Sequence, residues 1–345
     1  MIKGLKMNSE TIKKLDSELY KRVRLFHELV YKKNQPIDKA LDSLILFLNT
    51  LPLSRFSLWK TRMCPWCTAE PMYGWNICRD PDAALGSVTL LDIFSHNGYR
   101  REEALHNINT AVPNSFLFSQ LLTMLNDWVP QVRLAACQAI KRVMHITSPA
   151  IMTESLCEIL YRWTSWQRME KQEHLVIEAL LSLPKLAEPM RQKIIRSSSG
   201  PIPSLLAQIG RTSLLDCSLF EVATTAIQPS VRAKAYRFLF EKRMFWISGR
   251  EHKWVHRGLS EQHARVDTQE RHIEVEFSFE TLLEQASKDK SSKVRRVAIE
   301  YLIKNDTLMK DKIKHYALIF AQDKAHTVSE RGQFLLRKLS GDTTF

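Results

Sequence analysis

Residues 121–136 read Leu-Leu-Thr-Met-Leu-Asn-Asp-Trp-Val-Pro-Gln-Val-Arg-Leu-Ala-Ala, and this stretch decides the fold. An apolar pair closes one segment, a short turn follows, and a second apolar series begins at Val132. That series continues at Ala136, at Ala139 or Ile140, and at Val143, which is the 3.6-residue period of an amphipathic helix. The stretch therefore predicts two helices joined by a tight turn.

The same pattern returns twice near the end of the sequence. After an apolar pair, an aspartate stands five residues before a valine: Asp127 before Val132, Asp289 before Val294, and Asp323 before Val328. Arg133 and Arg295 directly follow the valine in the first two copies, and Ser329 stands there in the third. Weaker copies lie at Leu91–Phe94 and, without the aspartate, at Pro229–Arg232. Such self-similarity is typical of stacked helical repeats.

At these residues the chain resembles the HEAT repeat family, over roughly residues 85–340. The resemblance implies an all-α fold, a right-handed α-solenoid of HEAT-like helical hairpins, here with a small irregular or β-like insertion. It also implies that Asp127, Arg133, Asp289 and Arg295 hydrogen-bond between neighbouring repeats, and we expect Asp289 to be a partner of Arg295. In the family the second helix of each pair lines the concave surface. Helical hairpins of no particular family are the alternative.

The composition agrees with a helical fold. Only 10 of the 345 residues are glycine, whereas nucleotide-binding sheets need glycine for turns and for close backbone approach. Apolar residues make up 44% and charged residues 25%, as in ordinary soluble proteins. No apolar run approaches the roughly 18 residues of a membrane span, and the first residues show no signal peptide. We therefore expect a cytoplasmic protein without a membrane span and with reduced thiols.

Four regions are expected along the chain. Residues 1–80 should form an N-terminal helical cap, with helices at Ser9–Lys33 and Pro36–Asn49 and a Cys/Trp-rich irregular segment at Arg55–Pro81. HEAT-like repeats are expected at 81–245 and again at 280–345. Between them, residues 246–279 form a polar insertion rich in His and Arg, and the alternating apolar residues of Ile273–Phe279 predict a strand. An insertion of this kind often lies on the binding face.

Three cysteines could form part of a structural zinc site. Cys64 and Cys67 are separated by two residues and Cys78 follows, so three of the four ligands of structural zinc are present, with His96 as the nearest fourth. A redox pair is an alternative that lacks its βαβ context, and cysteines buried in the cap are another. We predict no bound metal and no cofactor.

Other candidate chemistry is sparse. Glu251, His252, His256 and His263 do not follow the metalloprotease spacing, in which glutamate directly follows the first histidine, and we interpret them as surface side chains. Trp163 and Trp166 stand three apart, which suits either an aromatic shelf for bases or core packing, and core packing is the default. Nucleophile elbows and phosphate-binding glycine loops are absent from the sequence, so we predict no catalytic residues.

Charge is the main functional signal. There are 50 Lys and Arg against 37 Asp and Glu, which gives a formal net charge of +13 and favours an acidic partner. The excess gathers on the predicted second helices, away from their apolar stripes. The candidate partner-binding residues are Arg142, Arg237, Lys242, Arg296, Arg337 and Lys338. Some of the other arginines there would serve only repeat packing, as we expect for Arg133 and Arg295.

The sequence therefore predicts a non-catalytic macromolecule-binding solenoid. We expect a protein-binding adaptor or an inhibitor that engages an acidic protein through a basic concave face. The alternative is a nucleic-acid-binding protein that contacts backbone phosphates. A helical-repeat DNA glycosylase belongs to that alternative, although the tryptophans and carboxylate of that family's groove are not matched here. A metal-dependent enzyme built on the insertion is a third class.

Overall fold

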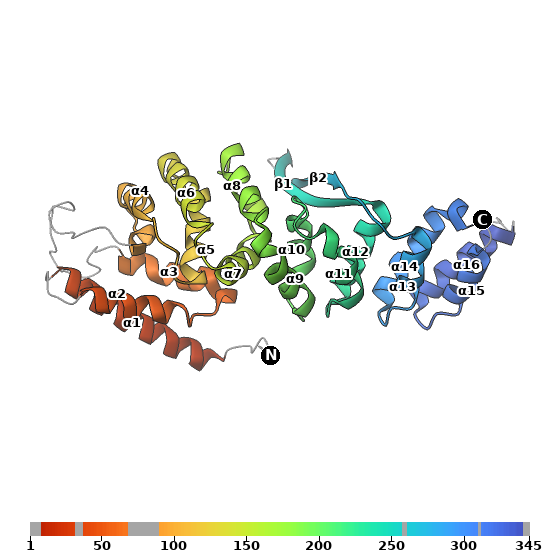
Figure 1. The fold of residues 1–345 in the computed structure, drawn as a ribbon, viewed down its shortest axis with the longest axis horizontal. Helices are drawn as coiled ribbons and strands as arrows, with labels where there is room; N and C mark the ends of the chain where they lie inside the picture. Colours follow the sequence, from red (N-terminus) through yellow and green to blue (C-terminus); the bar gives the residue numbers. More distant parts are fainter. Residues whose placement is uncertain (1–7, 32–36, 68–89, 257–260, 310–311, 341–345) are drawn as a thin grey trace. The chain divides into compact units, whose positions relative to one another are not determined.

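The computed structural model describes residues 8–31, 37–67, 90–256, 261–309 and 312–340. The chain forms two compact units, Met1–Leu181 (unit 1) and Ser182–Phe345 (unit 2), and each is described by itself. Both are built from paired helices, and the only sheet among the described residues is a two-stranded hairpin in unit 2 (Figure 1). The fold is thus an all-α solenoid of stacked helix pairs. None of the described helices is long and apolar enough to cross a membrane.

In unit 1, two long helices precede three stacked pairs. The helices are α1 (Ser9–Tyr31), α2 (Ile37–Leu48), α3 (Phe56–Cys67), α4 (Gly98–Asn107), α5 (Ser115–Thr123), α6 (Pro130–Val143), α7 (Pro149–Ile159) and α8 (Lys171–Leu181). Short 3₁₀ turns lie at Leu53–Arg55, Leu90–Phe94, Met124–Asn126 and Trp163–Ser165. The second helices α4, α6 and α8 lie side by side, and the first helices α3, α5 and α7 line the other side (Figure 1).

The helix pair expected from residues 121–136 is present as α5 and α6. Asn114 caps α5, where its side chain accepts a hydrogen bond from the Leu117 N–H at 2.9 Å. Pro130 occupies the first turn of α6, where its missing N–H costs nothing. The stripe from Val132 to Val143 is fully buried, as its period predicts.

In unit 2 the pairs continue around an inserted hairpin. The helices are α9 (Ala187–Arg196), α10 (Ile202–Ile209), α11 (Leu219–Thr225), α12 (Pro229–Glu241), α13 (Phe279–Ser287), α14 (Ser292–Lys304), α15 (Ile313–Ala321) and α16 (His326–Ser340). The 3₁₀ turns lie at Pro184–Leu186, Asp216–Ser218 and Asp306–Met309. Strands β1 (Arg243–His256) and β2 (Glu261–His272) pair antiparallel, from Arg243 opposite His272 to His256 opposite Glu261, and lie over α10 and α12 (Figure 1).

The expected strand at Ile273–Phe279 is wrong, because β2 ends at His272. The Ile273 N–H donates to the Lys242 carbonyl at 2.9 Å, which closes the hairpin, and the Ile273 side chain is buried. Ser278 then caps α13, which begins at Phe279. The alternation belongs to an extended connector that places Ile273 in the core. In the same connector, the Phe277 ring stacks on Phe220 with centroids 3.8 Å apart.

The irregular segment expected at Arg55–Pro81 is wrong in its first part. Residues Phe56–Cys67 form α3, in which Phe56, Trp59 and Met63 make a buried stripe at helical spacing. The remainder of that segment, residues 68–81, lies outside the described residues. The two helices expected in the cap are confirmed as α1 and α2, and the predicted domain boundaries stay predictions.

Candidate functional site

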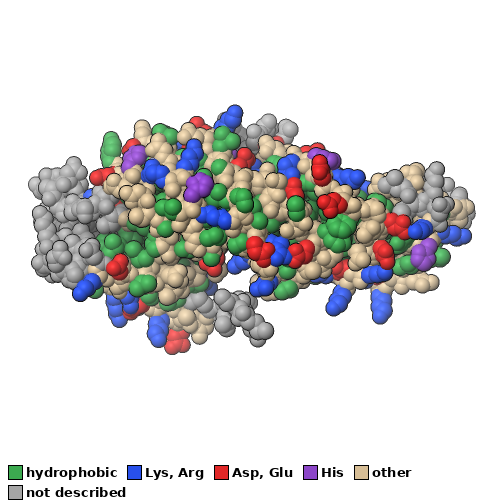
Figure 2. Space-filling model, in the orientation of Figure 1, with side chains coloured by type: hydrophobic (Ala, Val, Ile, Leu, Met, Phe, Trp, Pro, Cys, Tyr) green, Lys and Arg blue, Asp and Glu red, His purple; other side chains and the backbone are tan. Residues whose placement is uncertain are grey.

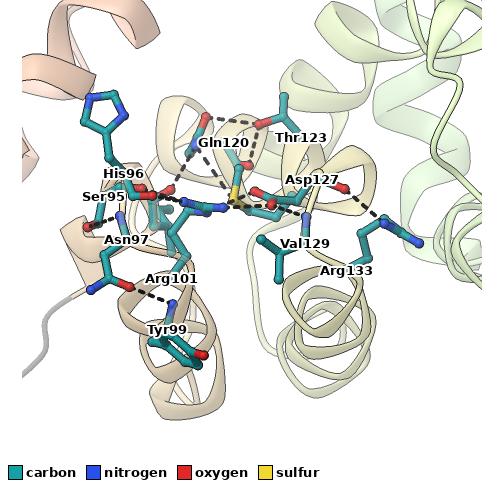
Figure 3. A network of polar contacts seen from close by, with 12 residues as sticks. Ser95, His96, Asn97, Tyr99, Arg101, Gln120, Thr123, Asp127, Val129 and Arg133 are labelled. Carbon is teal, nitrogen blue, oxygen red and sulfur yellow. Dashed lines mark hydrogen bonds and ion pairs between the residues drawn. The ribbon is translucent and has the colours of Figure 1, made fainter.

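Arginine–aspartate rungs join neighbouring helix pairs, and the first is formed by Arg101 and Asp127. Arg101 on α4 donates to both carboxylate oxygens of Asp127 at 2.9 and 2.8 Å (Figure 3). The same guanidinium donates to the carbonyls of Ser95 and His96, while Asp127 accepts from the Val129 N–H at the start of α6. Both charged side chains are about 6% exposed. The rung therefore ties the second helix of one pair to the turn of the next.

Two rungs of the same design occur in unit 2. Arg232 on α12 donates to both oxygens of Asp289 at 2.7 and 2.8 Å, across the inserted hairpin. Arg295 on α14 donates to both oxygens of Asp323 at 2.5 and 2.8 Å. The hydrogen bond from Arg295 lowers the pKa of the Asp323 carboxyl. Each aspartate also accepts a backbone N–H at the start of its own second helix.

The resemblance-based expectation of hydrogen bonds between neighbouring repeats is confirmed, but the expected pairing of Asp289 with Arg295 is wrong. Arg295 reaches only the main-chain oxygen of Asp289, at 2.8 Å. Its guanidinium points toward the next pair because the arginine lies one turn into its helix, whereas the aspartate of its own turn caps that helix. Arg133 likewise meets the Asp127 carbonyl at 3.2 Å.

Arg133 completes its rung with glutamates instead of an aspartate. It lies 3.1 Å from a carboxylate oxygen of Glu170 and 3.5 Å from one of Glu173 on α8. The turn before α8 is longer than those before α6, α12, α14 and α16, and it carries no aspartate at the usual place. The ion pair between neighbouring helix pairs is therefore preserved, with glutamate in place of aspartate. The Asp–Val spacing alone does not reveal this replacement.

Arg101 was missed by the sequence analysis, although a signal was present. Each of the four rung arginines stands three residues before a buried alanine: Ala104, Ala136, Ala235 and Ala298. The Val–Arg pair used to find the other copies is absent here, because Arg100 occupies the valine position. The spacing from arginine to small residue is thus the more general mark of the second helix.

Three second helices of unit 2, α12, α14 and α16, carry an excess of basic residues, and we call their basic side the basic face. Helices α12, α14 and α16 carry ten Lys and Arg and three Glu, whereas the first helices α11, α13 and α15 carry one Lys and three Glu. The basic residues are Arg232, Lys234, Arg237, Lys293, Arg295, Arg296, Lys304, Arg331, Arg337 and Lys338, and the glutamates among them are Glu241, Glu300 and Glu330. On the face drawn in Figure 2 both signs of charge are interspersed. By sequence, charge is segregated between the first and second helices of the three pairs from α11 to α16, whereas in the preceding pair the first helix, α9, is the basic one.

Three arginines of the basic face converge on one carboxylate. Arg237 on α12 lies 3.5 Å from Glu300 on α14, Arg296 on α14 lies 3.3 Å from it, and Arg331 on α16 lies 3.5 Å from it. We call these four residues the arginine cluster. Burial and the neighbouring Arg237 lower the pKa of Lys234, which lies near the cluster against the rings of Phe238 and Phe245.

The remaining predicted binding residues have different surroundings. Arg142 on α6 donates to the carbonyls of Leu105, His106 and Ile108, so it binds the carboxyl end of α4. Lys338 forms an ion pair with Asp306 at 2.7 Å. All four of these side chains are exposed. Lys242 follows α12 in a left-handed conformation with φ 51°, and Arg337 has no ion-pair partner among the described residues. The structure thus brings together Arg237 and Arg296, with Arg331 in addition.

The zinc hypothesis stays a prediction. Cys64 and Cys67 lie on α3 but outside the residues whose side chains are described, and Cys78 lies outside the described residues altogether. His252, His256 and His263 lie on the strands of the hairpin rather than on a helical turn. Among the described residues, no three His, Cys, Asp or Glu side chains are placed to hold a metal ion.

The tryptophan pair is resolved in favour of core packing for its first member. Trp163 is 1% exposed and its ring packs against His174 of α8, with centroids 5.3 Å apart. Trp166 is half-buried in the turn that follows. A fully buried ring offers no surface for stacking a base.

Comparison with known families places one part of this chain. Residues 117–146, which span most of α5 and all of α6, match the HEAT repeat. No curated protein sequence matches the chain. The matched segment contains Asp127 and Arg133, and the rung geometry recurs in three further helix pairs. Residues 117–146 are a HEAT repeat, and they lie within a solenoid of stacked helix pairs.

Proposed function

We propose that this protein is a non-catalytic adaptor or inhibitor that binds an acidic protein through the basic face of α12, α14 and α16. One observation carries the proposal: in the three helix pairs from α11 to α16 the second helices are strongly basic, and the first helices are not. A surface that needs charge only for solubility has no reason to separate the signs in this way. Keeping like charges close costs self-repulsion, which an acidic partner would offset.

The exposure of the arginines supports the same proposal. The side chains of Arg237, Arg296 and Arg331 are 39%, 41% and 35% exposed, so they are accessible from solvent. The side chains of the rung arginines are much less exposed, at 12% for Arg232 and 18% for Arg295. Structural and candidate binding arginines are therefore separable on the same helices, which allows binding to be tested without breaking the rungs.

The test compares two triple variants with equal loss of charge. Arg237→Gln, Arg296→Gln and Arg337→Gln together remove three charges from the basic face. Lys193→Gln, Lys314→Gln and Lys324→Gln remove three exposed charges from other parts of unit 2. The probes are a fluorescent peptide rich in Glu and Asp and a fluorescent random DNA duplex. Binding is followed by anisotropy at several salt concentrations.

We expect the peptide to bind wild type and the lysine variant about equally and the arginine variant at least about tenfold more weakly. Equal binding by all three proteins would refute the basic face as the site. Duplex binding that exceeds peptide binding, with a steep linear dependence on log salt, would instead establish the alternative of phosphate-backbone recognition.

A further inference from the structure

The arginine cluster has more positive charge than its single carboxylate neutralises. Three guanidinium groups from three successive helices surround Glu300, so the cluster retains an excess of two positive charges. Arg337 and Lys338 on α16 add to the charge of the same face. Adjacent guanidinium groups repel one another at this density, and a second anion would relieve that repulsion.

The donors of the cluster are largely uncommitted. The three contacts with Glu300 are ion pairs of 3.3–3.5 Å, longer than the usual charge-assisted hydrogen bond. Arg296 Nε, the atom that lies 3.3 Å from Glu300, is buried and faces that carboxylate without forming a hydrogen bond, so the exposed part of the guanidinium is what a ligand would meet. Besides Glu300, Arg331 donates only to the Thr327 carbonyl of its own helix. Each guanidinium has five N–H donors, so most of them remain available to a ligand.

The charge and geometry select a phosphomonoester among the anions that proteins carry. A phosphorylated hydroxyl has a charge of about −1.5 to −2 near neutral pH and three strong acceptor oxygens, which matches the excess of two charges and a set of arginine forks. A side-chain carboxylate has one charge and two oxygens. The phosphodiesters of a nucleic acid are singly charged and regularly spaced, and would favour a row of cations over three arginines at one point.

An exposed aromatic ring lies one helical turn from Arg331, a member of the cluster. Phe334 is 48% exposed and lies three residues after Arg331, hence one turn along the same side of α16. A residue beside the phosphorylated one could place an apolar side chain against this ring. Neither a free phosphate ion nor a regular phosphate backbone would use that contact.

We propose that the arginine cluster binds a phosphorylated serine or threonine on the acidic protein partner. This inference rests on the proposed function, because it names the group that the basic face recognises. Arg237, Arg296 and Arg331 would donate to the phosphoryl oxygens, and Glu300 would hold the three side chains in place before the ligand arrives. Phosphorylation of the partner would then control the association.

The experiment uses the full chain and one acidic peptide sequence in two forms, with a central serine or a phosphoserine. The cluster variant is Arg296→Gln with Arg331→Gln. Its control is Arg337→Gln with Lys338→Gln, which removes two charges from the same basic face, outside the cluster. Thermal unfolding of each variant verifies that the fold is retained, and affinities are measured by anisotropy.

We expect wild type and the control variant to bind the phosphopeptide at least about tenfold more tightly than the serine peptide, and the cluster variant to lose most of that ratio. A ratio near one in wild type, or an unchanged ratio in the cluster variant, would overturn the inference. If both peptides bind equally and both depend on the basic face, the proposed function stands without it. If neither peptide binds, the proposed function and this inference are both refuted. If the phosphopeptide binds but duplex DNA displaces it at lower concentrations than unlabelled phosphopeptide does, this inference is also overturned.

Discussion

Each rung arginine binds two parts of the fold at once. Arg295 donates to Asp323 of the next pair and to the carbonyls of Asp289 and Lys290 in the turn before its own helix. The aspartate also has two roles, since Asp323 accepts from Arg295 and caps the helix that follows. A charged pair this poorly exposed is costly to break, because the surviving charge is left without its partner.

Asp289→Ala is therefore expected to destabilise the protein through Arg232 and not through Arg295. We expect a loss of about 2–3 kcal/mol, since two charge-assisted hydrogen bonds from Arg232 and the hydrogen bond from the Ser291 N–H disappear together. Double-mutant cycles identify the partner: the coupling of Asp289→Ala with Arg232→Ala should exceed its coupling with Arg295→Ala. Glu330→Ala, at an exposed position of α16, is the control. The reverse order of couplings would contradict the observed pairing.

Glu158 is a carboxyl group that titrates near neutrality. Burial raises the pKa of its carboxyl to about 7, although Arg162 at 3.0 Å and Tyr161 oppose the shift. The folded state therefore holds this proton more tightly than the unfolded state does. The stability that results is fully present below the ordinary pKa of about 4.5 and is lost as the pH rises through about 7.

Glu158→Gln should remove this dependence. Relative to wild type, the variant is expected to gain about 1–2 kcal/mol on going from pH 5 to pH 8, because no carboxylate must then ionise in a buried site. Urea midpoints at the two pH values measure the effect. Glu154→Gln on the exposed side of the same helix is the control, and equal shifts in both variants would show that burial of Glu158 is not the cause.

At the scale of elements, the helices and a small β-like insertion were predictable, and the bounds of the two strands were not. The buried stripe of α6 extends over four turns and has a single period, so residues 130–143 could be assigned from sequence. The strands of the hairpin consist mainly of charged and polar residues with few apolar positions to set a period. The short alternation at Ile273–Phe279 was more regular than either strand, although it belongs to a connector.

Close packing between elements is sharpest at Gly332 on α16, the position that alanine occupies in the other second helices. A Cβ atom there would lie 2.2 Å from the Ala321 nitrogen and 2.5 Å from the Phe320 carbonyl carbon of α15. Both contacts are with backbone, which cannot rotate away. The two helices therefore approach more closely than an alanine side chain permits.

Gly332→Ala is expected to destabilise the protein by about 2–3 kcal/mol, as overpacking does, even though alanine is the better helix former by about 1 kcal/mol. Ser329→Ala, at a less crowded position of the same helix, should be neutral or slightly stabilising. Thermal unfolding of the two variants compares them directly. A stabilising Gly332→Ala would show that propensity outweighs the contact and that α15 and α16 lie farther apart.

At the scale of the whole molecule, the net charge follows from the composition, but the places where the charged side chains meet do not. The sequence placed candidate residues on second helices throughout the chain, including Arg142 of unit 1, which proves to be bound to the carbonyls that end α4. The cluster around Glu300 depends on which side chains of three different helices meet. A single sequence gives the period of each helix but not the register between them.

The last prediction concerns the rate at which an acidic partner finds this protein. With a formal net charge of +13 and a basic face on unit 2, association should be accelerated by long-range attraction. Raising the salt from about 10 mM to about 0.15 M shortens the screening length from about 30 Å to about 8 Å, so the association rate of the acidic peptide should fall at least about tenfold. The arginine triple variant and the lysine triple variant both have a net charge of +10, yet only the former should show a weaker salt dependence in stopped-flow measurements. If the salt dependence weakens equally in both variants, the overall charge and not the basic face directs the encounter, and the segregation of charge between the first and second helices from α11 to α16 has no part in binding.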